Sequence, residues 1–131
     1  LIGWVTGSQP IHQVGGRMLP RHERVRRPGA FRAIMARGRA YRGRYLSLHF
    51  LPRSGGPSRV GVTAGKKVGG AVQRNRAKRL LREAFRGVKD RLAGSFDMVL
   101  VARPETAASS LGPVSGELEQ LLQRARVLGC E

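Results

Sequence analysis

The chain has 131 residues, and its 25 Lys and Arg against 8 Asp and Glu give a formal net charge of +17. This length corresponds to one domain, and an apolar content of 40% excludes the composition of a fully disordered protein. The apolar stretches are far shorter than the roughly 20 residues of a membrane-spanning helix, so no membrane partner is predicted. The single cysteine, Cys130, cannot form an intrachain disulfide, which favours a reducing compartment and predicts a cytoplasmic location.

The charge is concentrated in the middle of the chain. Residues 17–91 carry 22 basic and 3 acidic residues, whereas residues 92–131 carry 3 basic and 5 acidic residues. Arg accounts for 21 of the basic residues, and Arg binds phosphate in bidentate geometry and stacks on bases. This asymmetry predicts a surface that binds a polyanion, in preference to charge that only keeps the protein in solution.

Residues 1–17 lack the patterning of the rest of the chain. Residues 1–16 contain no Lys, Arg, Asp or Glu, and the first methionine is Met18. We interpret this segment as a disordered extension or a misassigned start, and residues 18–131 as the domain. Trp4 leaves open the alternative that the segment docks on the domain.

One short helix and two strands are predicted first. Proline starts helices and glycine ends them, so the apolar spacing after Pro28 predicts a helix that ends at Gly38. Residues 44–52 and residues 59–65 alternate apolar and polar side chains, which predicts two strands. The Gly- and Pro-containing turn at residues 53–57 predicts that these strands pair as a hairpin.

Two more helices and one strand are predicted in the second half. The long helix runs from Ala71 to about Val88, a strand covers Asp97–Arg103, and Gly112-Pro113 introduces a final helix that runs to about Leu128.

The long helix separates apolar from basic side chains. At about 100° per residue, one arc contains the apolar residues Ala77, Leu80, Leu81, Ala84, Phe85 and Val88, which predicts the core face. The opposite side carries Asn75, Arg76, Lys78, Arg79, Arg82, Arg86 and Lys89, with Glu83 as its only acid. Like charges four residues apart repel each other, and a phosphate backbone offsets that repulsion. Arg74 lies at the border between the two sides, which predicts that it lines a cleft.

The link before the long helix, residues 63–72, is rich in Gly and contains Lys66-Lys67. It resembles a phosphate-binding loop, but a Walker motif requires Ser or Thr after its Lys. ATP binding is therefore not predicted.

Residues 59–86, RVGVTAGKKVGGAVQRNRAKRLLREAFR, resemble the signature of the protein subunit of bacterial ribonuclease P. The triplet Arg74-Asn75-Arg76 is the hallmark, and its specificity comes from the flanking residues, Lys66-Lys67-Val68-Gly69 before it and Lys78-Arg79 after it. The resemblance extends from about residue 19 to residue 128.

The resemblance implies an α/β fold, a two-layer α+β sandwich in which one small domain packs a central sheet against helices. It also implies a left-handed βαβ crossover, the opposite of the general rule.

The resemblance further implies that a partner RNA subunit is the catalyst. The protein binds that RNA and the 5′ leader of precursor tRNA, and hydrolysis of one phosphodiester bond gives the mature tRNA 5′ end. Magnesium is held mainly by the RNA, no organic cofactor is expected, and a protein oligomer is not required. The residues agree, because the basic central region offers only Glu23, Glu83 and Asp90, which are too few and too scattered for a two-metal site, so no catalytic residue is predicted in the protein.

Two groups of site residues follow from the resemblance. The surface for the RNA subunit is assigned to Lys66, Arg74, Asn75, Arg76, Lys78, Arg79 and Arg82. The leader cleft is assigned to Phe31, Met35, Ser47, His49, Thr63, Lys67 and Arg74. An aromatic ring such as that of Phe31 stacks on any base, which suits leaders of varied sequence.

The chain departs from the family pattern at two cleft positions. Met35 and His49 stand where aromatic residues are common in the family, which predicts weaker stacking on the leader. The alternatives stay open that Phe31 and Met35 are core residues and that His49 is an ordinary strand residue on the surface. The spacing of the histidines and Cys130 does not match a zinc site.

Three other functions are weighed against this one. A ribosomal protein or RNA chaperone explains the charge equally well but not the spacing between Phe31, the Lys66-Lys67 link and the triplet. A DNA-binding helix would require a dimer or paired recognition elements, and the sequence has no heptad pattern. A self-sufficient protein nuclease lacks the acidic residues it would need.

Overall fold

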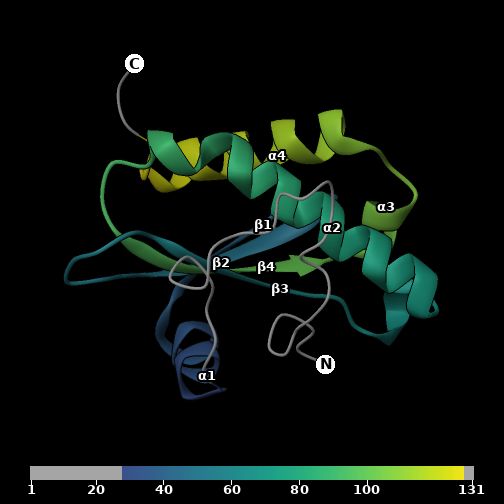
Figure 1. The fold of residues 1–131 in the computed structure, drawn as a ribbon, viewed down its shortest axis with the longest axis horizontal. Helices are drawn as coiled ribbons and strands as arrows, with labels where there is room; N and C mark the ends of the chain where they lie inside the picture. The colour runs from purple at the N-terminus through teal and green to yellow at the C-terminus, as the bar shows by residue number, and fades with distance from the viewer. Residues whose placement is uncertain (1–27, 129–131) are drawn as a thin grey trace.

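The computed structural model describes residues 28–128, which fold around one four-stranded sheet. In chain order the elements are α1 (Pro28–Arg37), β1 (Arg39–Arg42), β2 (Leu46–Pro52), β3 (Arg59–Thr63), the 3₁₀ turn η3 (Lys66–Val68), α2 (Ala71–Val88), the 3₁₀ turn η4 (Lys89–Arg91), β4 (Phe96–Ala102), α3 (Pro104–Ala107) and α4 (Leu111–Ala125). Helices α2 and α4 cover one face of the sheet and α1 packs on the other (Figure 1). The predicted α/β class is confirmed.

The strand order is β1-β2-β4-β3, so the predicted hairpin between the second and third strands is wrong. Strand β4 lies between them, antiparallel to β2 and parallel to β3. An alternating pattern identifies a strand but not its neighbour. Strand β4 takes the central place because it is apolar on both faces, with Met98, Val99 and Leu100 fully buried. The unit β3–α2–β4 joins two parallel neighbouring strands, as expected for a βαβ crossover.

Most predicted boundaries agree with the structure. The long helix spans residues 71–88 as predicted, whereas the last helix ends at Ala125, because Arg126 adopts the left-handed conformation with φ of 62°. The elements β1 and α3 were not predicted. Each has only four residues, which is too short for a recognisable period. Residues 1–17, predicted to be an extension, lie outside the described residues.

The core forms between the sheet and the two long helices. The six apolar residues of α2 that were predicted to face the core are all buried. They pack against the sheet and against the buried side of α4, which contributes Val114, Leu118, Leu121, Leu122 and Ala125. Within residues 28–128 no helix is long and apolar enough to cross a membrane.

A carboxylate from α4 fixes the turn between β1 and β2. Oε2 of Glu117 accepts a hydrogen bond from the backbone N–H of Arg44 at 2.5 Å. Its Oε1 accepts from the N–H groups of Tyr45 at 2.6 Å and Leu46 at 3.0 Å. The turn passes close to this carboxylate at Gly43, where an added Cβ would lie less than 3.0 Å from the carboxyl atoms. Glu117 therefore joins the helical layer to the edge of the sheet.

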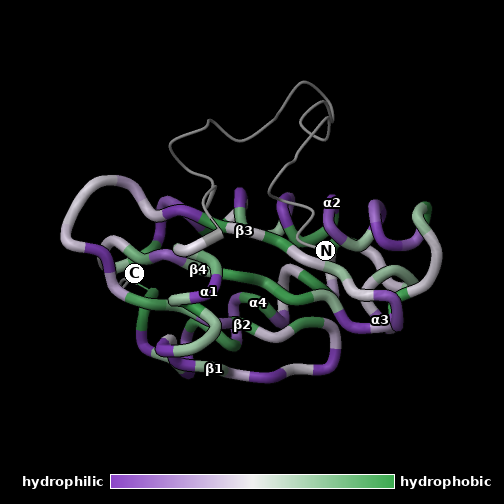
Figure 2. Tube along the Cα trace, turned by 90° about the horizontal axis from the view of Figure 1, so that it is seen from below, coloured by the Kyte–Doolittle hydropathy of each residue, from purple (hydrophilic) through white to green (hydrophobic). Residues whose placement is uncertain are grey.

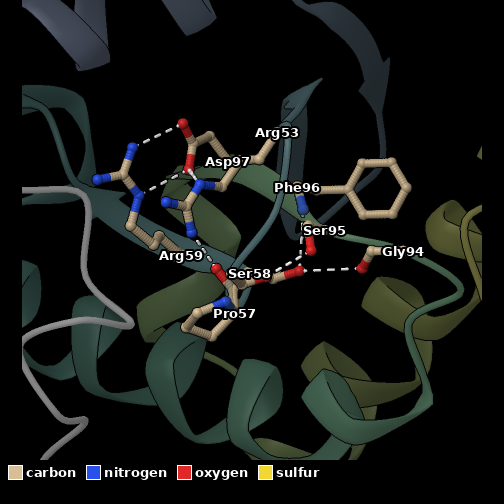
Figure 3. Close-up of polar contacts among 9 residues, drawn as sticks. Arg53, Pro57, Ser58, Arg59, Gly94, Ser95, Phe96 and Asp97 are labelled. Atoms are coloured by element: carbon tan, nitrogen blue, oxygen red, sulfur yellow. Dashed lines mark hydrogen bonds and ion pairs between the residues drawn. The ribbon is translucent and has the colours of Figure 1, made fainter.

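Polar contacts tie the loop between β2 and β3 to the start of β4 (Figure 3). Arg59 donates to both carboxylate oxygens of Asp97 at 2.8 Å, and Arg53 lies 3.4 Å from the same carboxylate. The bonds to Asp97 raise the pKa of the Arg59 guanidinium. Ser58 Oγ accepts from the N–H of Phe96 at 3.0 Å, so both ends of the loop are anchored.

Candidate nucleic-acid interface

The basic side of α2 is directed away from the sheet. In Figure 2 the outer turns of α2 are coloured as hydrophilic and run along one edge of the sheet beside β3, while β1 forms the opposite edge. Asn75 and Arg79 are exposed on this outer side. Near the end of α2, Arg86 forms an ion pair with Glu83 at 2.8 Å. This pair places the one acid of the basic side, Glu83, beside Arg86 in the last third of the helix.

Arg76 differs from the other residues of the triplet because it binds its own protein. Its Nε donates to the carbonyl oxygen of Ala107 at 2.8 Å, and its Nη2 donates to that of Ser109 at 2.8 Å. These two carbonyls belong to the end of α3 and the link to α4. Nε and Nη2 of Arg76 therefore hold the α3–α4 link against α2, while the assignment of the exposed Arg76 side chain to the RNA-subunit surface stays a prediction.

The flank of α2 on the other side from Arg76 carries a row of cations. Arg74, Lys78 and Arg82 recur every fourth residue and are each half-buried. Burial, together with the charges of Arg82 and Arg74, lowers the pKa of Lys78. Because α2 contacts β3 and α4 packs on its other flank, this row lies along the β3 edge of the sheet. An anion placed there would relieve the repulsion between the cations.

The sheet face that carries α1 brings together the predicted cleft residues of two strands, β2 and β3. The register sets Arg42, Ser47, Val101 and Thr63 side by side across β1, β2, β4 and β3. The neighbouring row contains His49, Val99 and Gly61. Ser47 and Thr63 are therefore separated by one strand, on the same face. Ser47 is only 7% exposed, so it contributes to the floor of this face and not to its rim.

Helix α1 contacts β2 and β4 on this same face. It is anchored by Ile34, which is 1% exposed, while Phe31 is half-buried against the core. Met35 lies one turn after Phe31 and is 38% exposed. The alternative that Met35 is a core residue is therefore wrong, whereas Phe31 both packs on the core and keeps part of its surface open. We refer to the surface formed by Phe31, Met35 and the two cross-strand rows as the α1 groove.

The dibasic link connects the groove to α2. Lys66 and Lys67 form the exposed part of η3, directly after β3, and Val68 is buried beneath them. Gly69 has φ of 138°, a conformation that L side chains rarely adopt, and it brings the chain into α2. The groove and the cationic row of α2 therefore meet at the β3 edge, with the two lysines at their junction.

The charge around His49 gives a testable pH dependence. Burial, and secondly the charge of Arg42, lower the pKa of His49 from 6.5. The unfolded chain therefore takes up a proton on His49 before the folded chain does, and the free energy of unfolding falls as the pH drops below 6.5. We expect a smaller fall for His49→Gln, measured by urea unfolding between about pH 7 and pH 5. Identical pH dependence in the two proteins would contradict this role of His49.

Comparison with known proteins identifies the family. The family model described as Ribonuclease P matches residues 19–126. The chain belongs to the ribonuclease P protein family. The ribonuclease P protein component of Desulfovibrio desulfuricans is 40% identical over 111 residues, which cover 82% of this chain and 85% of that protein. The component from Chloroflexus aurantiacus is 38% identical over 106 residues, which cover 80% of this chain and 78% of the relative.

Solved structures of ribonuclease P proteins share the fold. The protein from Staphylococcus aureus matches with a TM-score of 0.71 and 26% identity, covering 82% of this chain and 98% of that chain. The protein from Thermotoga maritima matches with a TM-score of 0.69 and 30% identity, covering 78% of this chain and 96% of that chain. The family predicted from the signature is therefore confirmed.

Two arginines beside the ribonuclease P signature were not predicted as site residues. Arg42 ends the cross-strand row that contains Ser47 and Thr63. Arg103 follows β4 and is half-buried, and its buried Nε has no hydrogen-bond partner among residues 28–128. A buried donor of this kind is costly unless a further group satisfies it. Both residues lie outside the signature: the strand register reveals Arg42, and the buried Nε reveals Arg103.

Proposed function

We propose that this chain is the protein subunit of a ribonuclease P ribonucleoprotein, which binds a catalytic RNA subunit and the 5′ leader of precursor tRNA. The proposal rests on family membership together with one observation. The cationic row of α2 and the α1 groove are separate surfaces that meet at the β3 edge. Such an arrangement suits a protein that binds one RNA and guides a strand of another.

The exposed side of α2 is suited to a folded RNA. Asn75 and Arg79 are exposed, and the row with Arg74, Lys78 and Arg82 lies beside them. Guanidinium and ammonium groups in this arrangement attract phosphates and release counterions when they bind. We assign this side, with Lys66, to the RNA subunit. Arg76 supports it from within the protein by holding the α3–α4 link.

The α1 groove is suited to a single strand. The partly exposed ring of Phe31 offers a stacking surface for a base of any kind. Met35 adds an adaptable apolar contact, and His49 and Thr63 add polar groups across the strands. Lys67 and Arg74 at the junction, with Arg103 nearby on the chain after β4, supply positive charge for the leader phosphates.

The bond cleavage itself is assigned to the RNA subunit. Among residues 28–128 no group of three His, Cys, Asp or Glu side chains lies together as a metal site. We assign the magnesium ions of the reaction to RNA phosphates, as the resemblance to the family implies. The role of the protein is to bind the RNA subunit and to position the precursor tRNA. The product of the reaction is tRNA with a mature 5′ end.

Cleavage of a precursor tRNA by a bacterial ribonuclease P RNA, at magnesium too low for the RNA alone, tests this function. We expect this chain to restore cleavage at the mature 5′ end. Tight binding of the RNA without any gain in cleavage would overturn the proposal and favour an RNA chaperone or ribosomal protein.

The leader site has its own prediction. Phe31→Leu keeps an apolar side chain against the core but removes the ring, so we expect affinity for precursor tRNA to fall roughly tenfold. Affinity for the RNA subunit and for mature tRNA is expected to be unchanged, which filter binding measures directly. An equal loss for mature and precursor tRNA would contradict the assignment of Phe31 to the leader.

A further inference from the structure

A second basic surface lies on the sheet edge opposite to β3. It consists of exposed arginines around β1, which we call the β1-edge surface: Arg39, Arg42, Arg44 and Arg124. Strand β1 is the outermost strand beyond β2, and β3 is the outermost strand on the other side. Three strand spacings, about 14 Å, separate these two edges. The β1-edge surface is therefore distinct from the cationic side of α2.

Negative charge is scarce around this surface. The sequence from residue 28 to residue 82 contains no Asp or Glu. The acid closest to the turn, Glu117, uses both carboxylate oxygens on the backbone N–H groups of residues 44–46. One carboxylate balances only one of the four arginine charges of this surface, so a positive field remains at the edge of the sheet.

Two tyrosines lie among these arginines. The Arg44 guanidinium carbon lies 5.5 Å from the centroid of the Tyr45 ring, and that of Arg124 lies 5.9 Å from the Tyr41 ring. Arg39 donates to the Tyr41 hydroxyl at 3.3 Å. These contacts hold flat guanidinium groups at the surface, and such groups bind phosphates and stack on unpaired bases.

The α1 groove leads directly to this surface. Arg42 is the last member of the cross-strand row that contains Ser47 and Thr63, and its charge contributes to the lowered pKa of His49 inside the groove. A strand that crosses the sheet face from β3 therefore reaches Arg42 when it leaves over β1. Arg44 follows on the adjoining turn.

We propose that the β1-edge surface binds the phosphate backbone of the upstream part of the leader, beyond the nucleotides held in the α1 groove. This inference rests on the proposed function, because it takes the ligand of the groove to be a single RNA strand. It predicts a benefit that depends on leader length. A leader that ends inside the groove gains nothing from these arginines, whereas a longer leader does.

The test uses the holoenzyme reconstituted with a bacterial ribonuclease P RNA. Affinity is measured for precursor tRNAs with leaders of about 4 and about 12 nucleotides, and for mature tRNA. For Arg42→Ala/Arg44→Ala we expect about a fivefold loss with the long leader and no loss with the short leader or mature tRNA. The salt dependence of long-leader binding is expected to fall by about 1.4 in its logarithmic slope, for two phosphate contacts on a single strand.

Two control variants distinguish the effect of positive charge on the β1-edge surface from the effect of the protein's overall positive charge. Arg42→Lys/Arg44→Lys keeps both positive charges and is expected to retain most of the gain from a long leader. Arg91→Ala removes an exposed arginine that pairs with Glu119 outside this surface, and is expected to leave both affinities unchanged. A loss with Arg91→Ala equal to that of the double variant would overturn the inference.

Other outcomes distinguish this inference from the proposed function. An equal loss at both leader lengths, or weaker assembly with the RNA subunit, would overturn the upstream-leader site. So would an unchanged affinity for the long leader. If Phe31→Leu binds both leaders normally while Arg42→Ala/Arg44→Ala shows the length-dependent loss, the stacking role of Phe31 fails and the β1-edge surface stands.

Discussion

Glu117→Ala is expected to lower the free energy of unfolding by about 2–4 kcal/mol. Three backbone N–H groups, those of residues 44–46, lose a charged acceptor at once, and hydrogen bonds to a charged group contribute about 1.5–3 kcal/mol each when they are buried. The Arg44 N–H is exposed and can form a hydrogen bond with water in the variant, so the loss is smaller than the sum of the three hydrogen-bond contributions. Urea unfolding followed by circular dichroism measures this difference.

A double-mutant cycle with Gly43 isolates the contact that carries this effect. An alanine Cβ at this position would lie less than 3.0 Å from the Glu117 carboxyl atoms. Gly43→Ala should therefore destabilise the parent protein, and should cost much less in the Glu117→Ala background, where the clash is gone. Strictly additive effects would contradict the geometry of this turn.

Glu117→Gln separates the charge from the hydrogen bonds. The amide oxygen can still accept from the N–H groups of Tyr45 and Leu46, but the amide nitrogen faces the N–H of Arg44. About half the destabilisation of Glu117→Ala is expected. Because the turn carries Arg44, the same variants also test whether the β1-edge surface depends on a fixed turn.

Local patterns predicted the parts of the fold that local physics determines. The opposed stripes of α2 predicted both its bounds and its buried residues, because an 18-residue helix repeats its period several times. The hairpin prediction was wrong because strand pairing is not local. Strand β4 begins more than thirty residues after β3 in the sequence, yet it lies between β2 and β3 in the sheet. The alternation of side chains within β2 and β3 gives no information about this neighbour.

The candidate site was predicted only where a motif named its residues. The signature indicated the cationic side of α2. The resemblance named Ser47, His49 and Thr63, which the register brings to one sheet face, and Phe31, whose helix α1 packs on that face. Arg42 and Arg103 were missed, because a lone arginine beside a strand carries no pattern. Their significance comes from neighbours on other strands. The double role of Arg76 was missed for the same reason, since its partners Ala107 and Ser109 lie in a segment with no predicted element.

The two arginines Arg76 and Arg79 are expected to give opposite results when replaced by alanine. Arg76→Ala removes donors to two carbonyl oxygens, so the free energy of unfolding should fall by about 2 kcal/mol. Arg79 is exposed on the outer side of α2, so Arg79→Ala should change stability by less than about 0.5 kcal/mol. The affinity of Arg79→Ala for the RNA subunit should fall severalfold. The slope of the logarithm of this affinity against the logarithm of the salt concentration should be smaller by about 0.9, the value for one phosphate contact on a duplex.

Amide hydrogen exchange shows whether an arginine holds the α3–α4 link in place or acts only through direct contact with RNA. The N–H of Thr106 donates to the carbonyl of Arg103, and that of Ser109 donates to the carbonyl of Thr106. Both amides should exchange faster in Arg76→Ala, because the segment that Arg76 holds is released, and they should be unchanged in Arg79→Ala. Arg76→Lys retains the charge but cannot bind both carbonyls with a planar fork, so it should resemble Arg76→Ala in exchange and stability. If Arg76→Lys instead restores both, charge alone holds the link, and Arg76 belongs with the residues that act on RNA through electrostatics.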